Sequence, residues 1–406
     1  MAEGEKRARA LEIILLLGLV SLCGDVMYEG AWAVSGPFLL LLGGSATVVG
    51  LVSGLGELLG YGLRLASGYL ADQTRRYWLF LAAGYGMLIA VPLLAFAGSW
   101  EIAAMLYLVE RMGKGIRSPS KDAILSHASS RVGRGWGFAL HEALDQVGAI
   151  VGPLVFTAVF VAGFSGLEGY RAGFLVLGVP MLFLAASLLA ARMRAPDPVQ
   201  MELGSGGKDA VPGNGIPPVF VPYALFTALT MAGFVAFPLV AYHLRAASLL
   251  PEAVIPLLYA LAMGMDAVGA LLIGRAYDRS GLAVLVVIPV LNLPVAFLAF
   301  QATEFPAAAL PAAALAASIW GVSLGAQETI LRAAVADMVP VSRRGTAYGI
   351  FNTVYGGAWF LGSVAFGLLY DRDMIPLLII ISAALQILSV PAVLRVIPRG
   401  PDRAAD

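Results

Sequence analysis

The chain has 406 residues, of which 59% are hydrophobic and 13% are charged, and its formal net charge is zero. Soluble domains carry about 45–50% apolar and about 25% charged residues. This composition excludes a water-soluble globular protein and indicates that lipid is the solvent. The balanced charge gives no sign of a nucleic-acid partner, and one cysteine, Cys23, excludes an intramolecular disulfide.

Apolar runs of membrane-spanning length recur along the whole chain. A spanning helix needs about 20 mainly apolar residues, and this criterion predicts twelve helices. The first run is interrupted by Asp25, Glu29 and Gly36-Pro37, which predicts a kink or break. The predicted spans are residues 11–40, 46–71, 77–97, 101–118, 135–162, 170–191, 218–243, 252–276, 282–301, 306–337, 346–370 and 374–396.

Residues 192–217, between the sixth and seventh spans, are rich in Pro, Gly and Ser with scattered charge, which is the composition of a linker. The chain is therefore predicted to divide into an N-terminal bundle, residues 1–191, and a C-terminal bundle, residues 218–406. Each bundle contains six spans. The expected fold class is an all-α membrane protein with two pseudo-symmetric six-helix bundles.

The basic residues predict the orientation, because cytoplasmic loops are enriched in Lys and Arg. With a cytoplasmic N-terminus, the outer loops hold only Arg171, Arg245 and Arg372, and the remaining loop cations lie inside. Both chain termini are therefore expected in the cytoplasm. Lys121 is interpreted as one of the residues that mark the cytoplasmic membrane surface.

A short string occurs once in each half of the chain. It has a Gly, an Asp four residues later and then basic residues, between two apolar runs. The copies are Gly68, Asp72, Arg75 and Arg76 in the first half, and Gly274, Asp278 and Arg279 in the second. Residues 114–117 also align with residues 324–327, and residues 134, 135 and 152 with residues 344, 345 and 362. Two parallel copies are typical of transporters whose substrate lies between the halves.

This string resembles the signature loop between helices 2 and 3 of the major facilitator superfamily. Arg111 with Gly115 resembles the family's fourth-helix motif, and the surrounding GKGIR…P…DA string, with Asp25 and Glu29, is similar to that of a prokaryotic subgroup. The resemblance implies secondary transport by alternating access in a prokaryotic inner membrane. It also implies that the two repeated loops act as cytoplasmic latches between conformational states.

Gly148, Gly152 and Pro153 in the fifth span match the core of a motif associated with proton-driven exporters of this superfamily. Glycines four residues apart give a flat helix face, and the proline bends the helix. The small residues that usually follow are replaced by Leu154, Val155 and Phe156, so the match is partial. Ordinary helix packing is an equally good interpretation of these three residues.

Charged residues inside the predicted spans are the candidates for function, since a charge in the membrane is costly unless it is paired or hydrated. Asp25 and Glu29 share one helix face by their spacing. The resemblance places eight charged residues on helices that line the central cavity. They are Asp25, Glu29, Arg111, Glu142, Asp145, Asp266, Glu328 and Arg332. The alternative is a set of structural ion pairs, with Glu57–Arg64 and Glu328–Arg332 as expected examples.

The sequence therefore favours a proton-coupled exporter of a small, cationic or amphipathic solute, acting as a monomer in the lipid bilayer. The alternatives are an organic-anion or nutrient carrier, a non-transporting receptor of the same fold, and a lipid flippase. No enzyme activity, cofactor or metal is expected. The three histidines, His127, His141 and His243, lack metal-ligand spacing, and no phosphate-binding Gly-rich loop occurs.

Overall fold

The structure is a computed structural model that describes residues 3–130, 132–198, 216–301, 306–340 and 343–397. Within these ranges every regular element is a helix. The N-terminal half contains α1 (Glu3–Ala33), α2 (Ser35–Leu41), α3 (Ala46–Thr74), α4 (Tyr77–Gly86), η1 (Met87–Ile89), α5 (Ala90–Leu93), η2 (Leu94–Phe96), α6 (Trp100–Ser129), α7 (Arg134–Val161), α8 (Gly166–Val176) and α9 (Val179–Arg194).

The C-terminal half repeats this plan with more interruptions. It contains α10 (Phe220–Ala232), α11 (Phe237–Ala246), α12 (Val254–Ser280), η4 (Gly281–Val286), α13 (Val287–Asn292), α14 (Val295–Phe300), η6 (Pro306–Ala308), α15 (Ala309–Met338), α16 (Arg344–Asp371) and α17 (Ile375–Leu394). Residues 199–215, most of the predicted linker, lie outside the described residues.

The described helices cross the membrane twelve times. Length and composition alone identify ten candidate spans, one of which runs over 47 residues from Val254 to Phe300. That length far exceeds the bilayer's hydrocarbon core, and the chain reverses at Gly281, whose φ is 58°, so this segment crosses twice. The twelfth crossing is α6, which is as long as the others but carries more charges. The predicted all-α fold is therefore confirmed.

The boundaries of three spans show where the sequence was informative and where it was not. The predicted interruption of the first span occurs at Val34, between α1 and α2. The seventh span is also broken, over residues 233–236, and this break was not predicted. The fourth span was predicted to end at residue 118, but α6 continues through the charged segment to Ser129.

Glycines at equivalent positions set the helix contacts of the two halves. A Cβ atom on Gly68 would lie 3.3 Å from Pro119, and one on Gly274 would lie 3.3 Å from Thr329. Each repeated glycine therefore lets the second span of its half approach the fourth. The two contacts relate α3 with α6 in the same way as α12 with α15, so the sequence repeat is also a packing repeat.

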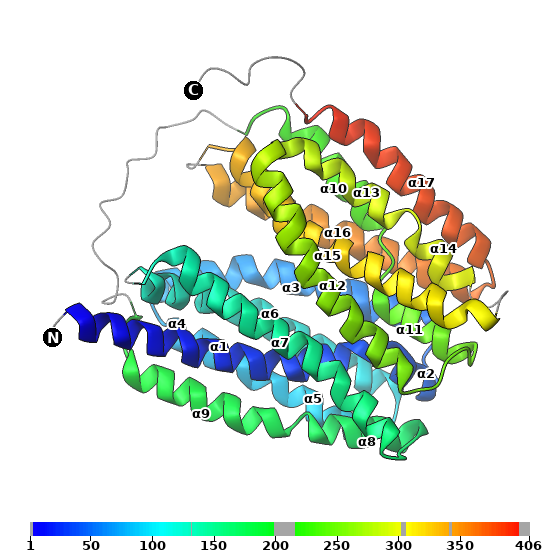
Figure 1. The fold of residues 1–406 in the computed structure, drawn as a ribbon, viewed down its shortest axis with the longest axis horizontal. Helices are drawn as coiled ribbons and strands as arrows, with labels where there is room; N and C mark the ends of the chain where they lie inside the picture. Colours follow the sequence, from blue (N-terminus) through cyan, green and yellow to red (C-terminus); the bar gives the residue numbers. More distant parts are fainter. Residues whose placement is uncertain (1–2, 131, 199–215, 302–305, 341–342, 398–406) are drawn as a thin grey trace.

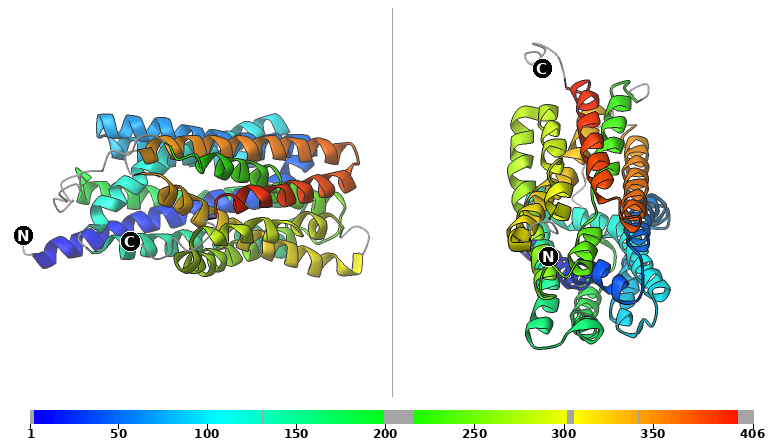
Figure 2. Two further views of the ribbon diagram at one scale, coloured as in Figure 1. Left: turned by 90° about the horizontal axis from the view of Figure 1, so that it is seen from above. Right: turned by 90° about the vertical axis from the view of Figure 1, so that its right-hand side faces the viewer.

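The two halves meet at the end of the molecule away from the chain termini and diverge toward the other end (Figure 1). Figure 2 shows the long helices of both halves running roughly side by side. At the closed end, which we call the outer end, α2 packs on α11 so tightly that a Cβ on Gly36 would lie 1.9 Å from Pro238 O. Only glycine fits this crossing.

Two carboxylates of the C-terminal half reach helix N-termini of the N-terminal half at the outer end. Asp371 accepts hydrogen bonds from the backbone N–H groups of Ala46 (2.9 Å) and Thr47 (2.8 Å), at the start of α3. Glu252 accepts one from Gly166 N (2.8 Å), at the start of α8. Carboxylates satisfy the free N–H groups there and interact favourably with the helix dipole, so both contacts hold the outer end closed.

Candidate functional site

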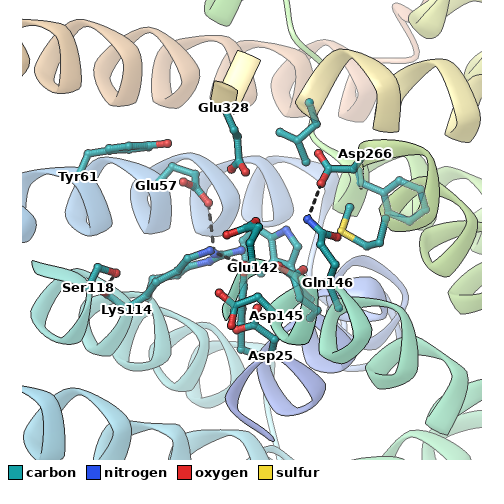
Figure 3. Close-up of a pocket in the computed structure, with 18 of the residues that line it drawn as sticks. Asp25, Glu57, Tyr61, Lys114, Ser118, Glu142, Asp145, Gln146, Asp266 and Glu328 are labelled. Atoms are coloured by element: carbon teal, nitrogen blue, oxygen red, sulfur yellow. Dashed lines mark hydrogen bonds and ion pairs between the residues drawn. The ribbon is translucent and has the colours of Figure 1, made fainter. Parts of the chain in front are cut away.

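A cavity of about 260 Å³ lies between the two halves and is lined mainly by charged and aromatic side chains. Its walls come from α1, α3, α4, α6 and α7 of the first half, and from α11, α12, α15 and α16 of the second. The structure brings all eight predicted cavity residues into this lining: Asp25, Glu29, Arg111, Glu142, Asp145, Asp266, Glu328 and Arg332. Figure 3 shows several of them pointing into one space.

Arg111 on α6 forms the centre of a buried charge network. Its Nη1 lies 3.3 Å from Glu57 Oε1 and its Nε lies 3.7 Å from Glu110 Oε2. Arg117 lies six residues further along α6, and its Nη2 is 3.6 Å from the other carboxylate oxygen of Glu110. The expected pairing of Glu57 with Arg64 is therefore wrong, because the carboxylate of Glu57 is turned toward α6 rather than along its own helix.

Aromatic rings of α1 also contact basic side chains of α6. The Arg111 guanidinium stacks over the Trp32 ring at 3.7 Å from its centroid. Lys114 Nζ lies 4.1 Å from the centre of the Tyr28 ring and also donates a hydrogen bond to the Tyr28 hydroxyl. Cation–π contacts of this kind stabilise desolvated cations, so α1 holds the basic face of α6 in place.

Lys121 belongs to the cavity rather than to the membrane surface. Its Nζ lies 3.2 Å from Asp145 Oδ2, and the same carboxylate oxygen lies 3.6 Å from His141 Nδ1. The interpretation of Lys121 as a surface marker is therefore wrong. Asp25 lies beside Asp145 (Figure 3) and packs where Gly148 leaves room, since a Cβ on Gly148 would lie 3.0 Å from Asp25 Cβ.

Two hydrogen bonds cross the cavity from one half to the other. The Tyr259 hydroxyl on α12 donates to Glu29 Oε2 on α1 at 2.6 Å. Gln146 Nε2 on α7 donates to Asp266 Oδ2 on α12 at 3.0 Å. Both acceptors are carboxylates with side chains that are almost fully buried. The two halves are therefore linked at the cavity through acids of opposite halves.

Besides Asp25, Glu29 and Asp122, three more carboxylates of the lining have no ion-pair partner among the described residues. Glu142, Asp266 and Glu328 form no ion pair with any described residue. The expected pair of Glu328 with Arg332 is therefore not formed, although both side chains line the cavity. The labelled side chains in Figure 3 show Glu328 and Glu142 on one side of the Gln146–Asp266 hydrogen bond.

The outer end of the cavity has an aromatic wall from the C-terminal half. Trp320 stacks on Phe234 with ring centroids 5.5 Å apart, and Phe237 meets Tyr259 edge-on at 4.7 Å. Trp320 Nε1 donates to Val235 O at 2.9 Å, which ties the ring to the break between α10 and α11. In this break the helical hydrogen bonding is interrupted, since Phe234 N donates to Met231 O, three residues back. Phe237, which follows the break, lines the cavity.

The residues predicted to form latches lie at the end of α3 and of α12, away from the cavity. Asp72 accepts a hydrogen bond from the Tyr77 hydroxyl at 3.1 Å, within its own half. Arg75 ends α3 in a left-handed conformation with φ of 53°, and Arg76 is exposed. None of the latch residues forms an ion pair with a described residue of the other half.

The glycines of the fifth span have a clear packing role on α1. A Cβ on Gly148 would lie 2.5 Å from Leu22 O, and one on Gly152 would lie 2.4 Å from Val26 O. Both obstacles are backbone atoms, which cannot move aside. Pro153 lies inside α7 beside them. Close packing of α7 on α1 therefore explains why these two positions are glycine.

Some residues of the lining were not found from the sequence. These residues are uncharged: Tyr28, Trp32, Gln146, Tyr259 and Trp320. The sequence alone does not indicate whether an uncharged side chain in a membrane span faces the lipid or the cavity. Helical spacing would have helped in one case, since Tyr259, Met263 and Asp266 lie on one face of α12. The neutral residues that orient the charges could not be chosen without the contacts between helices.

A paired six-helix architecture around a charged central cavity defines a polytopic membrane protein built from two homologous halves. The family model described as Major Facilitator Superfamily matches residues 17–363, so the chain belongs to this superfamily. The chain is 41% identical to an uncharacterized protein of Mycobacterium tuberculosis over 387 residues, which cover 94% of this chain and 92% of that protein.

Solved transporter structures share this fold. The nucleoside transporter NupG superposes with a TM-score of 0.69 at 14% identity, covering 95% of this chain and 98% of NupG. A D-xylose–proton symporter superposes with a TM-score of 0.65 at 14% identity, covering 96% and 98%. At these identities the similarity shows the fold and says nothing about which residues bind substrate.

Proposed function

We propose that this chain is a secondary transporter that exports a small cationic or amphipathic solute in exchange for protons. The observation that carries the proposal is the charge of the cavity: eight carboxylates and six basic groups line it, and only two of the carboxylates, Glu57 and Asp145, form an ion pair with a described residue. Ionisable residues inside a membrane protein typically mark substrate and proton pathways.

The contacts between the two halves support a mechanism of alternating access. The inter-half hydrogen bonds of the described residues lie at the cavity or at the outer end. Opening the outer end requires loss of the Asp371 and Glu252 contacts, with closure of the opposite end by the loops that contain Asp72 and Asp278. With cytoplasmic termini in a prokaryotic inner membrane, as the basic residues favour, the present cavity faces the cytoplasm.

The acids have different local partners, and this suggests a division of roles. Asp145 already has a cation in Lys121, so its charge is compensated. Asp25 forms no ion pair with a described residue and lies beside that compensated pair. Asp25 is therefore the preferred proton-exchanging group on α1, and Glu29, bound by Tyr259, is placed to couple proton binding to the position of the other half.

The test is proton movement driven by solute in inside-out membrane vesicles. A preformed acid interior is followed with a pH-sensitive dye while amines, drugs, sugars and organic anions are added in turn. A transported cation should release protons from the vesicles. We expect Asp25→Asn to reduce this release at least about tenfold, and Glu101→Gln, at an exposed position of α6, to leave it unchanged. Transport by the reconstituted protein that ignores an imposed pH gradient would refute proton coupling.

A second candidate is an organic-anion carrier. It is favoured by Lys114, which lines the cavity and has an aromatic hydroxyl rather than a carboxylate as its partner. Arg332 likewise forms no ion pair with a described residue. This alternative predicts that Arg332→Gln abolishes binding, whereas proton exchange with a cation predicts larger losses from Asp25→Asn or Asp145→Asn.

A further inference from the structure

The hydrogen bond between Gln146 and Asp266 leaves two acceptors unused. Gln146 Nε2 donates to Asp266 Oδ2, and the remaining oxygens, Gln146 Oε1 and Asp266 Oδ1, are enclosed by protein and accept no hydrogen bond from any described residue. The Asp266 side chain is only 4% exposed and lines the cavity. Buried acceptors without donors are costly, so two of them at one place indicate a group that donates to both.

Asp266 is not needed for the helix crossing at which it lies. A Cβ on Gly325 of α15 would lie 2.2 Å from Asp266 O, and one on Gly115 of α6 would lie 2.8 Å from Gly60 O. These contacts are equivalent in the two halves, and the first half has a glycine where the second has the acid. Helix packing therefore uses only the backbone of residue 266, and its carboxylate requires another explanation.

The charge around these two acceptors is negative. Arg111, Arg117 and Lys121 each have a carboxylate partner, and Lys114 lies on the Tyr28 ring. The two other basic groups of the lining, Arg64 and Arg332, contact Tyr61 of α3. Asp266, Glu142 and Glu328, in contrast, form no ion pair with a described residue and point toward the same space (Figure 3). A donor that enters this space is therefore favoured if it carries a positive charge.

The adjoining wall suits the apolar part of a ligand. Tyr259 and Met263 lie on the same face of α12 as Asp266, and Trp320 packs 6.2 Å from Tyr259, between ring centroids. Aromatic faces attract cations, and a methionine sulfur adapts to apolar or aromatic groups. An ammonium group at Asp266 would therefore have an aromatic and apolar surface beside it for the rest of the molecule.

We propose that Asp266 and Gln146 form the ammonium subsite of the cavity, and that its ligand is an organic amine with an apolar or aromatic body. The ammonium N–H groups donate to Asp266 Oδ1 and Gln146 Oε1, and the body packs on Tyr259, Met263 and Trp320. This inference rests on the proposed transport function and narrows its substrate to amines that retain an N–H bond.

Equilibrium binding to the purified full chain tests the subsite without a membrane gradient. Isothermal titration at neutral pH compares phenethylamine with its N,N,N-trimethyl derivative, with phenethyl alcohol and with 3-phenylpropanoate. We expect phenethylamine to bind at least about tenfold more tightly than the trimethyl derivative and the alcohol, and the anion to show no binding. Equal affinity of the trimethyl derivative, or preference for the anion, would overturn the proposal.

Two variants locate the binding. Asp266→Asn and Gln146→Leu should each weaken phenethylamine binding about tenfold or more, and Glu101→Gln should leave it unchanged. Thermal unfolding shows which variants are folded. If a variant does not fold, the comparison of ligands on the unaltered protein still tests the subsite. Unchanged binding by folded Asp266→Asn contradicts the subsite. Amine binding without proton-coupled flux refutes only the transport proposal, and proton-coupled flux of another solute without amine binding refutes only the subsite.

Discussion

Arg111 holds two carboxylates and an indole ring at once. It lies 3.3 Å from Glu57, 3.7 Å from Glu110 and 3.7 Å from the centre of the Trp32 ring, and its side chain is 4% exposed. A buried charge is tolerated only when such partners replace water. The local consequence is that α1, α3 and α6 share one charge network, so its loss should affect folding as well as function.

We expect Arg111→Leu to destabilise the protein by about 3 kcal/mol, the lower end of the range for removing one partner of a buried ion pair. Glu110 keeps Arg117 as its ion-pair partner in this variant. The destabilisation therefore comes mainly from Glu57, whose buried carboxylate is left without a cation. Adding Glu57→Gln should recover much of the stability. Thermal unfolding in detergent measures both effects, with Arg192→Leu on the exposed end of α9 as the control. A double variant less stable than Arg111→Leu would contradict this account.

Single residues also show the limit of prediction from sequence. The charged lining could be predicted, because a charge within an apolar run stands out. The partners could not, because spacing along one helix identifies only neighbours on that helix. Glu57 was assigned to Arg64 of its own helix but contacts Arg111 of another, and Lys121 was assigned to the membrane surface but contacts Asp145.

Among the helices, α7 and α1 depend on glycine for their approach. We expect Gly152→Ala to destabilise the protein by about 1–3 kcal/mol, as overpacking does, because the new Cβ would lie 2.4 Å from Val26 O and 2.7 Å from Gly30 N. Gly62→Ala in α3 is the matched control, since its Cβ meets nothing within 4 Å. That change should be neutral or stabilising by up to about 1 kcal/mol. Equal shifts in thermal unfolding would exclude the packing interpretation.

The start of α3 provides a second prediction for an element. Asp371→Ala removes the carboxylate that caps it from the other half, and a lost cap costs about 0.5–2 kcal/mol. The closed outer end should therefore become less populated relative to the open one, by about twofold to thirtyfold. Spin labels at Ser165 and Ala247, in a Cys23→Ser background, report this as a longer distance distribution.

Asp373→Ala serves as the control for this cap, because Asp373 follows α16 in sequence and no hydrogen bond joins its side chain to a described residue of α3. It should leave the distances between the labels unchanged. If Asp371→Ala also leaves them unchanged, the contacts of α2 with α11 and of Glu252 with α8 hold the outer end without this cap.

At the scale of the whole molecule, the repeat predicted from the sequence accounts for the two-bundle architecture. The two halves contribute different side chains to the cavity, and this difference could be assigned only from the contacts. Positions 110, 114 and 118 of α6 correspond to Trp320, Leu324 and Glu328 of α15 at the offset of 210 residues. The first half thus has Glu110, Lys114 and Ser118 where the second half has an aromatic, an apolar and an acidic side chain. Twelve spans and the family follow from apolar runs and repeated loops, but the break over residues 233–236 lies in an apolar stretch that gave no signal.

This asymmetry, with closure at one end, makes the accessibility of the cavity a property of the whole molecule. Ser118 lines the cavity on α6, and with the outer end closed a water-soluble reagent reaches it only from the side of the termini. In the Cys23→Ser background, Ser118→Cys should react with a membrane-impermeant thiol reagent at least about tenfold faster in inside-out vesicles than in right-side-out vesicles. Exposed Gln73→Cys and Ala247→Cys calibrate the two surfaces.

Adding Asp371→Ala to the Ser118→Cys protein should raise the slower of the two reaction rates, because it weakens closure of the outer end. Faster reaction in right-side-out vesicles would contradict either the predicted membrane orientation or the assignment of the closed end. The reactivity of the two calibrating positions decides which of the two is wrong.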